Sequence, residues 1–247
     1  MKLALLADLH ANLEGATACL EHAREQGAEA FAFLGDLVGY GADPEAVLDL
    51  VAAEAAAGAV VVRGNHDAAV LAAGADTMNR AAEAALDWTR ARLSERHRAF
   101  LAGLPLEARQ GEVHFVHASA DRPADWTYVC DPLRAEQSLV AAGATWVFSG
   151  HVHEPMLYYL GSTPRPLGFK PVPGVAIPVP AHRRWLAIVG SAGQPRDGNT
   201  AACYALLDRA RSTLTFHRVP YDWARAAAKI RAAGLPESLA RRLERGE

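Results

Sequence analysis

The histidines and carboxylates that could do chemistry in this chain are concentrated in five short motifs, and each motif directly follows a short apolar run. The motifs are Asp8-Leu9-His10, Gly35-Asp36, Gly64-Asn65-His66-Asp67, His117 and Gly150-His151-Val152-His153. In an α/β sheet, polar groups that follow strands gather in the crevice beyond the carboxyl ends of those strands. We therefore expect the five motifs to converge on one site.

The donor atoms of these motifs indicate a metal site. The candidate ligands are Asp8, His10, Asp36, Asn65, His117, His151 and His153. Carboxylate and amide oxygens mixed with imidazoles, without a thiolate, suit first-row divalent ions such as Mn, Fe, Co, Ni or Zn. Such a large set exceeds the needs of one tetrahedral ion and suits two ions with a bridging carboxylate, for which we choose Asp36. Ligands two residues apart share one face of an extended chain, so the pairs at 8 and 10 and at 151 and 153 are each expected to bind together.

The motifs resemble those of the calcineurin-like metallophosphoesterase superfamily, bacterial and archaeal phosphodiesterases in particular. The superfamily pattern D-x-H, G-D, G-N-H-[DE], H and G-H-x-H is present in order between residues 8 and 153. The resemblance implies that one ion is bound by Asp8, His10, Asp36 and His153, and a second by Asp36, Asn65, His117 and His151. It also implies that His66 faces the substrate phosphate without binding metal, and that Asp67 orients His66.

The elements that position the motifs are predicted from periodicity and turn residues. Strands are predicted over residues 3–7, 30–34, 60–62, 113–116 and 145–148, then over 156–160, 175–179, 185–189, 202–207 and 213–219. Helices are predicted over 12–26, from 44 with Asp43 as the cap, over 79–98 and the stretch to 104, over 131–141, and from 221 to the end. The fold class is therefore α/β with α+β character: a first β layer alternating with helices and a second, mostly antiparallel layer. The resemblance implies the same two-sheet sandwich flanked by helices.

Composition narrows the class of protein. With 247 residues and 51% hydrophobic content, one domain over 1–247 can bury a large core. No apolar stretch approaches the ~20 residues that span a bilayer, so no membrane partner is expected. A net charge of -3 gives no general attraction to nucleic acid. Three widely spaced cysteines form neither a disulfide framework nor a C-x-x-C site, which favours the cytoplasm.

The function indicated is hydrolysis of phosphate esters. Two cations would lower the pKa of a shared water, and the hydroxide would attack phosphorus directly. His66 would protonate the leaving alkoxide, because imidazole titrates near neutral pH. The expected substrates are small or nucleotide-like phosphodiesters or phosphomonoesters. No pattern specifies the oligomeric state, for which a homodimer is our expectation.

Residues outside the motifs could contact the substrate. Tyr40, between two glycines, would bring an aromatic ring to the rim of the site. The loop over 189–199 offers Arg196 as a guanidinium clamp for phosphate, ahead of Arg63. Ordinary surface turns are the alternative for both segments. The basic pairs at 183–184 and 241–242 are expected to be solvated.

Other functions compete with this prediction. Protein Ser/Thr phosphatases and symmetric dinucleoside tetraphosphatases of the superfamily carry an arginine soon after the G-D motif, whereas this chain continues Leu-Val-Gly-Tyr-Gly after Asp36. A non-catalytic interaction scaffold on the same fold is the alternative from another class. The presence of every ligand together with His66 favours chemistry over the scaffold.

Overall fold

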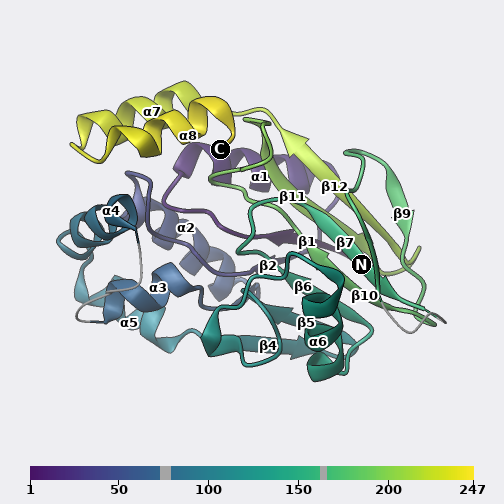
Figure 1. The fold of residues 1–247 in the computed structure, drawn as a ribbon. Coiled ribbons are helices and arrows are strands. Elements are labelled where there is room, and N and C mark those ends of the chain that lie inside the picture. Colours follow the sequence, from purple (N-terminus) through teal and green to yellow (C-terminus); the bar gives the residue numbers. More distant parts are fainter. Residues whose placement is uncertain (73–78, 162–165) are drawn as a thin grey trace.

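The structure is a computed structural model that describes residues 1–72, 79–161 and 166–247. In these ranges the chain forms a sandwich of two six-stranded sheets (Figure 1). In spatial order, the first sheet contains β3 (Val60–Val61), β2 (Ala30–Phe33), β1 (Lys2–Leu6), β11 (Ala202–Asp208), β12 (Thr213–Val219) and β9 (Ala176–Pro178). The second contains β4 (Glu107–Gln110), β5 (Val113–Val116), β6 (Trp146–Ser149), β10 (Arg184–Ile188), β7 (Met156–Leu160) and β8 (Leu167–Phe169).

Both sheets are mixed. Strands β1, β2 and β3 are parallel, and β11 joins β1 antiparallel. Strands β5, β6 and β10 are parallel, and β7 joins β10 antiparallel. The two-sheet sandwich is thus confirmed, but the expected division into a layer alternating with helices and a mostly antiparallel layer is wrong. Each sheet contains three adjacent parallel strands, which form one side of the first sheet and the centre of the second, and antiparallel strands complete both.

Alternation along the strands explains how the layers pack. On β1, Leu3 and Leu5 face the second sheet, while Ala4 and Leu6 face the helices. Both faces are buried, which explains why this strand appears in the sequence as a continuous apolar run. Between the sheets, Phe115 packs against other large side chains of the shared core.

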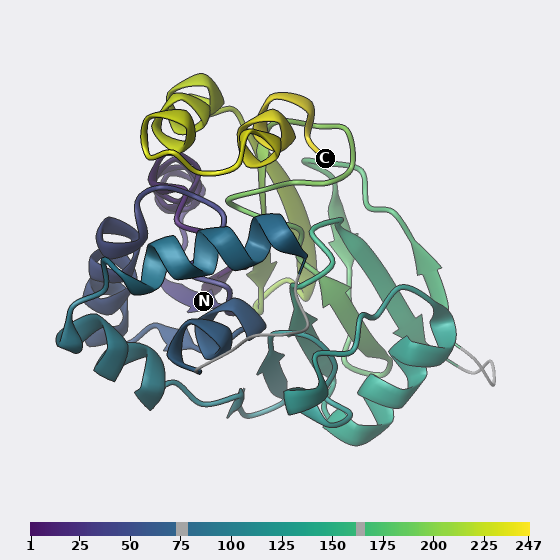
Figure 2. The same cartoon turned by 60° about the vertical axis from the view of Figure 1, so that its left-hand side comes forward.

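Helices cover the outer faces of both sheets (Figures 1 and 2). The first sheet is covered by α1 (Leu13–Glu25), α2 (Pro44–Ala56), α3 (Asn65–Leu71), α4 (Arg80–Arg90) and α5 (Glu95–Gly103), and the second by α6 (Pro132–Ala142). A short 3-10 turn, η1 (Pro123–Asp125), precedes α6. The C-terminal hairpin of α7 (Trp223–Ala232) and α8 (Glu237–Arg245) packs on α4 and Tyr40.

Polar side chains set several helix boundaries. Asn12 caps α1 by accepting a hydrogen bond from the Gly15 amide, and Asp131 caps α6. The helices predicted over 79–98 and the stretch to 104 are α4 and α5, and the boundary between them lies earlier than predicted because Ser94 caps α5. Asp43 occupies the predicted N-cap position of α2, with Pro44 in the first turn, but its carboxylate accepts from Lys229 Nζ at 2.7 Å and makes no capping hydrogen bond to the helix.

Helix α3 and the strands β4 and β8 are short elements that were not predicted from the sequence. Helix α3 has a polar first turn, and the edge strands β4 and β8 are mostly exposed, so none of them carries a strong apolar period. The three cysteines are free, in agreement with the absence of a disulfide framework. Within the described ranges, no helix has both the length and the apolarity that crossing a membrane requires.

Candidate metal and phosphate site

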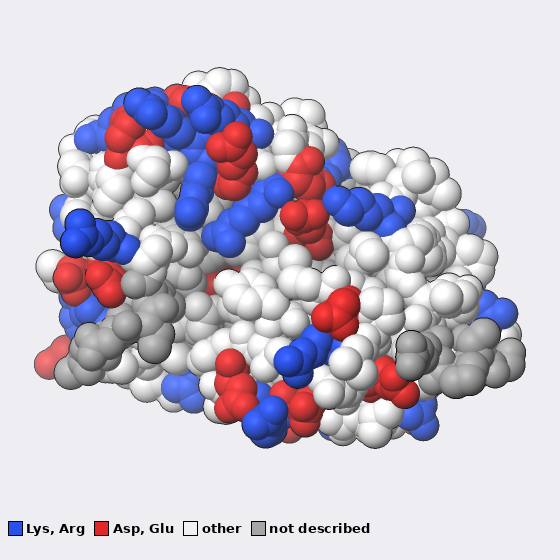
Figure 3. Space-filling model, in the orientation of Figure 1, with Lys and Arg blue, Asp and Glu red and all other residues white. Residues whose placement is uncertain are grey.

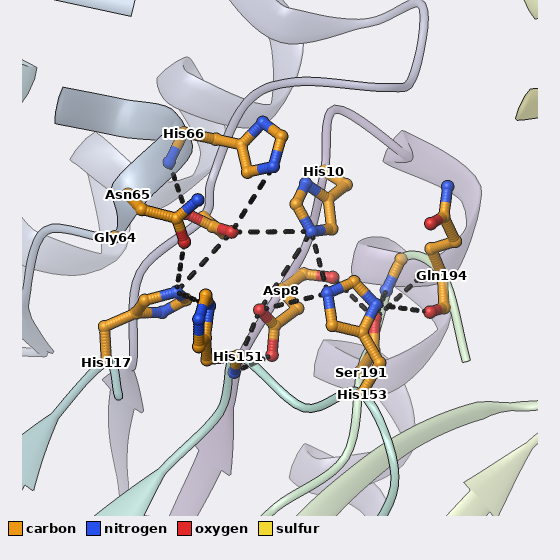
Figure 4. A network of polar contacts seen from close by, with 12 residues as sticks. Asp8, His10, Gly64, Asn65, His66, His117, His151, His153, Ser191 and Gln194 are labelled. Atoms are coloured by element: carbon orange, nitrogen blue, oxygen red, sulfur yellow. Dashed lines mark hydrogen bonds and ion pairs between the residues drawn. The ribbon is translucent and has the colours of Figure 1, made fainter. Parts of the chain in front are cut away.

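The five motifs meet where the carboxyl ends of parallel strands from both sheets come together. Asp8, Asp36 and Asn65 follow β1, β2 and β3 of the first sheet, whereas His117 and His151 follow β5 and β6 of the second. Figure 4 shows the side chains of Asp8, Asn65, His117 and His151 pointing toward one another. The sandwich itself thus forms the site, because each sheet contributes part of the same polar cluster.

Five of the seven candidate ligands have left-handed backbone and do not lie in extended chain. Positive φ angles occur at Asp8 (53°), His10 (46°), Asp36 (51°), His151 (66°) and His153 (65°). Left-handed backbone is uncommon for non-glycine residues and tends to occur at functional sites. The expectation that ligands two residues apart share a strand face is therefore wrong, and tight turns bring the side chains together instead. His151 and His153 also contact different parts of the cluster.

The first part of the cluster brings two imidazole nitrogens face to face. His10 Nδ1 lies 3.2 Å from the Val38 carbonyl oxygen, and His153 Nδ1 lies 2.6 Å from that of Gln194. Each Nδ1 therefore carries the proton and donates, which leaves a lone pair on each Nε2. The two Nε2 atoms are 3.1 Å apart, and Asp8 Oδ1 lies 3.4 Å from His153 Nε2. Acceptors that converge in this way fit a cation.

The second part repeats this arrangement. His117 Nδ1 lies 2.7 Å from the Leu34 carbonyl oxygen, so its Nε2 presents a lone pair. That Nε2 lies 3.0 Å from Asn65 Oδ1 and 3.1 Å from His151 Nδ1. Asp36 Oδ2 joins the two parts, because it lies 3.5 Å from His117 Nε2 and 3.6 Å from His10 Nε2. Asp8, His10 and His153 form one group that could hold a metal, and Asp36, His117 and His151 form another.

Burial determines the protonation of these groups. It raises the pKa of Asp36 to about 8, and together with the Asp36 carboxylate it raises the pKa of Asp8. Burial also lowers the pKa of His117 to about 4 and lowers the pKa values of His10 and His153. The protein alone thus favours protonated carboxyls and neutral imidazoles. A divalent cation would favour the ionised carboxylates and displace their protons.

His66 and Asp67 begin α3 beside the cluster. His66 Nε2 lies 4.0 Å from Asp36 Oδ2, and the His66 amide donates to Asp36 Oδ1 at 2.8 Å. The orienting contact expected from Asp67 to His66 does not occur. Asp67 accepts from the amides of Leu37, Val38 and Gly64, and His66 Nδ1 has no hydrogen-bond partner in the described ranges. Asp67 therefore joins the loops that follow β2 and β3.

The loop over 190–199 borders the cluster. Ser191 Oγ donates to the carbonyl oxygen of Asp8 at 2.8 Å, and the Gly193 amide donates to the same oxygen at 3.0 Å. Gln194 holds the ring of His153 through its carbonyl oxygen. These contacts assign the loop a positioning role that its glycine and proline content alone did not specify.

A cleft of about 630 Å³ opens beside the cluster. The residues that line it are Tyr40, Asn65, His66, Ala68, Ala69, Ala72, Asn79, Ala82, Asp125, Trp126, Tyr128 and His151. The sequence did not single out Trp126 or Tyr128. The Tyr128 ring stacks on His151 at 3.9 Å, and the Trp126 ring meets His117 edge-on at 5.9 Å. The two aromatic residues in the segment Asp-Trp-Thr-Tyr over 125–128 are the sequence feature that could have indicated this wall of the cleft.

The arginines differ in their relation to the site. Arg196 donates to Gln194 Oε1 through Nη2 at 2.9 Å, and its Cζ atom lies 5.6 Å from the centre of the Tyr40 ring. Arg63 forms no hydrogen bond or ion pair with the cluster in the described part of the chain. The expectation that both residues of the 241–242 pair are solvated is wrong for Arg242, because the packing of α8 brings its Nη1 to 3.5 Å from Gln194 Oε1.

Comparisons with known proteins agree with this geometry. The calcineurin-like phosphoesterase superfamily domain matches residues 1–212. An uncharacterized protein of Methanocaldococcus jannaschii is 31% identical over 98% of this chain and 96% of its own length. A metallophosphoesterase from Sphaerobacter thermophilus has 34% identity and a TM-score of 0.88 over 100% of this chain and 99% of its own. A hypothetical protein from Pyrococcus horikoshii shares the fold at 21% identity, with a TM-score of 0.80 over 100% and 98% of the two chains. The chain therefore belongs to the calcineurin-like phosphoesterase superfamily.

Proposed function

We propose that the protein hydrolyses small phosphate esters with two divalent ions that share Asp36. The observation that carries this proposal is the position of the Asp36 Oδ2 atom between two groups of converging acceptors, 3.6 Å from His10 Nε2 and 3.5 Å from His117 Nε2. Asp8 and His153 would complete the first ion's ligands. Asn65 and His151 would complete the second.

The donor set supports ions of the first transition row. Four imidazoles with carboxylate and amide oxygens suit Mn, Fe, Co, Ni or Zn better than Mg or Ca. When bound, such ions polarise phosphate oxygens and lower the pKa of a water, which supplies a nucleophile for phosphorus at neutral pH. The protein's own contribution is to hold the ligands at fixed positions through the carbonyl oxygens of Leu34, Val38 and Gln194.

His66 is the residue that we assign to the leaving group. The Nε2 atom of His66 faces the cluster. The residue also lines the cleft, where the organic portion of the ester would lie. Burial, with nearby positive charges, lowers the pKa of His66 to about 3. A phosphate dianion beside the ring would raise that pKa, so substrate binding would favour the protonated imidazole that can donate to the departing oxygen.

The cleft supports a small organic leaving group. Its volume of about 630 Å³ lies within the range of ligand sites. Alanines on α3 and α4 and the ring of Trp126 form apolar walls, and Asp125 is the one charged residue other than histidine among its described lining residues. An uncharged or planar leaving group fits this lining better than a polyphosphate chain. The cytoplasmic location and the homodimer stay predictions.

A substrate screen tests the proposed function. Protein stripped with a chelator and reconstituted with Mn, Fe, Co, Ni or Zn is assayed against chromogenic monoesters and diesters and against nucleotides. We expect hydrolysis that depends on the added ion. The variant His114→Gln is the control, because His114 is a buried histidine outside the cluster, paired with Glu107. A protein that binds metal and hydrolyses none of these esters would instead support the interaction scaffold.

A further inference from the structure

The C-terminal hairpin lies outside the residues matched by the family domain, and it reaches the site. Residues 1–212 carry the family match, whereas α7 and α8 begin at Trp223. The hairpin is held in place by Lys229, whose Nζ lies 2.7 Å from Asp43 Oδ2 and 2.6 Å from Glu14 Oε1. The C-terminal end of the hairpin contacts the loop over 190–199 through a hydrogen bond from the Gly198 amide to the Gly246 carbonyl oxygen.

Two guanidinium groups meet at this junction. Gln194 Oε1 accepts from Arg196 Nη2 at 2.9 Å, and Arg242 Nη1 of α8 lies 3.5 Å from the same oxygen. Their Cζ atoms lie 5.6 and 5.5 Å from the centre of the Tyr40 ring. The same ring lies 4.5 Å from the rings of His10 and His66. One aromatic ring thus separates the guanidinium pair from the candidate metal ligands.

In the part of the chain that the structure describes, no carboxylate is in direct contact with the charge of this pair. Among residues 1–72, 79–161 and 166–247, neither Arg196 nor Arg242 forms an ion pair with a carboxylate. The nearby acidic groups are engaged elsewhere: Asp197 pairs with Arg218, and Glu244 pairs with Arg231 at 2.7 Å. Figure 3 shows Lys and Arg side chains gathered over α7 and α8, above a hollowed and largely uncharged area.

Two cations that share one neutral oxygen repel each other, and an anion between them would remove that repulsion. Gln194 is 1% exposed, so its side chain has little freedom to follow either guanidinium away from the site. The Tyr40 ring, which both guanidinium groups approach, also lies 4.5 Å from the His66 ring, so the pair lies near the residue assigned to the leaving group.

We propose that Arg196 and Arg242 together bind the dianionic phosphate of a monoester, so that the C-terminal hairpin makes the enzyme prefer phosphomonoesters over phosphodiesters. The inference rests on the proposed phosphoesterase function. A monoester dianion carries one more negative charge on its nonbridging oxygens than a diester, and the forked donors of a guanidinium match two such oxygens at once. The two negative charges of a bound dianion would balance the two positive charges of the pair.

The test compares two esters with the same leaving group, 4-nitrophenyl phosphate and methyl 4-nitrophenyl phosphate. In Arg242→Gln, we expect kcat/KM to fall roughly ten- to a hundredfold for the monoester, the scale of a charged hydrogen bond, and less than about threefold for the diester. Arg196→Gln should behave alike. Arg245→Gln is the matched control, because Arg245 lies on the same helix and pairs with the exposed Glu247. Equal losses on both esters, or no loss, would overturn the proposal.

Binding of inorganic phosphate to the metal-loaded protein, measured by calorimetry, separates the two proposals. A roughly tenfold or larger rise in Kd for Arg242→Gln, with no change for Arg245→Gln, supports the clamp even if no ester is hydrolysed, in which case only the proposed function fails. An unchanged Kd, with ester hydrolysis intact, removes the clamp alone. If Arg242→Gln does not fold, Arg242→Lys replaces it, since this variant keeps the charge without the fork and should show a smaller loss in the same direction.

Discussion

Backbone carbonyl oxygens decide which nitrogen of each histidine is available to a metal. The carbonyls of Val38 and Leu34 accept from Nδ1 of His10 and His117, so Nε2 of each ring is left as the donor to a cation. The sequence cannot show this selection, because any residue supplies a carbonyl. It follows from where the loops after β2 place their backbone.

Substitution of Asp36 tests whether one carboxylate serves both ions. We expect Asp36→Asn to lose both metals on purification, because an amide keeps the shape but lacks the charge that two cations share. Asp8→Asn is the matched comparison and should lose about one metal, since Asp8 belongs to one group only. Elemental analysis of protein prepared without strong chelators measures both. Two tightly held metals in Asp36→Asn would show that Asp36 is not the bridge.

The role of His66 can be separated from phosphate positioning by the leaving group. His66→Ala should keep its metals and hydrolyse an alkyl ester about 10²–10⁴ times more slowly, the usual contribution of positioned proton transfer. For a nitrophenyl ester the loss should be much smaller, because nitrophenolate departs without a proton. Steady-state kinetics on both esters measure the difference. Similar losses on the two substrates would leave His66 with a positioning role only.

At the scale of elements, the loop over 190–199 must lie directly on the turn after β1. A Cβ atom on Gly193 would lie 1.9 Å from the carbonyl oxygen of Leu9, which is backbone and cannot rotate away. The same turn carries Asp8 and His10. The absence of a side chain at residue 193 therefore sets the distance between this loop and two candidate ligands.

Gly193→Ala should consequently affect both stability and metal binding. We expect a loss of about 1–3 kcal/mol in the free energy of unfolding, the range for overpacked sites, and weaker retention of metal. Gly103→Ala is the control, because Gly103 is the last residue of α5 and no described atom lies within 4 Å of an added Cβ. Chemical denaturation and metal analysis measure the two effects. Equal stability of the two variants would mean that the loop moves freely.

The sequence predicted the main elements and the candidate ligands, and it failed where tertiary contacts decide. Strands such as β1 and β11 were predicted because both of their faces are apolar, whereas β4 was not, because an exposed edge strand has no apolar period. Asp43 has the residue type of a cap, but the distant Lys229 takes its carboxylate. Arg242 illustrates the same limit, since only the docking of the α7–α8 hairpin brings a residue of the last helix to Gln194.

At the scale of the whole molecule, a histidine far from the candidate metal ligands links stability to pH. His217 of β12 stacks on Tyr204 at 4.9 Å, and the His22 ring lies 5.1 Å away. Its Nε2 has no hydrogen-bond partner in the described ranges. Burial and the neighbouring His22 lower the pKa of His217 to about 4. The ordinary value is near 6.5, so between these pH values the unfolded chain binds a proton that the folded protein does not.

The free energy of unfolding should therefore fall as the pH drops from about 6.5 to 4. His217→Phe keeps a ring without the titrating group, and its stability should fall less over the same range. His182→Gln, at an exposed position, is the control and should follow the wild type. Urea denaturation at several pH values, with the metal content held equal, measures the difference. A constant gap between wild type and His217→Phe would show that His217 does not contribute.

The division of the ligands between the sheets has a consequence for folding. Asp8 and His151 lie 143 residues apart in the chain, as do His10 and His153, and each pair meets in the site. Bringing two residues so far apart in the chain into contact costs conformational entropy, and contacts between residues close in sequence do not offset this cost. An ion bound to ligands from both sheets would act as a reversible cross-link and stabilise the docked sandwich by mass action. Since a chain with only one sheet formed presents only part of the ligands, full metal affinity would arise only when the two sheets dock.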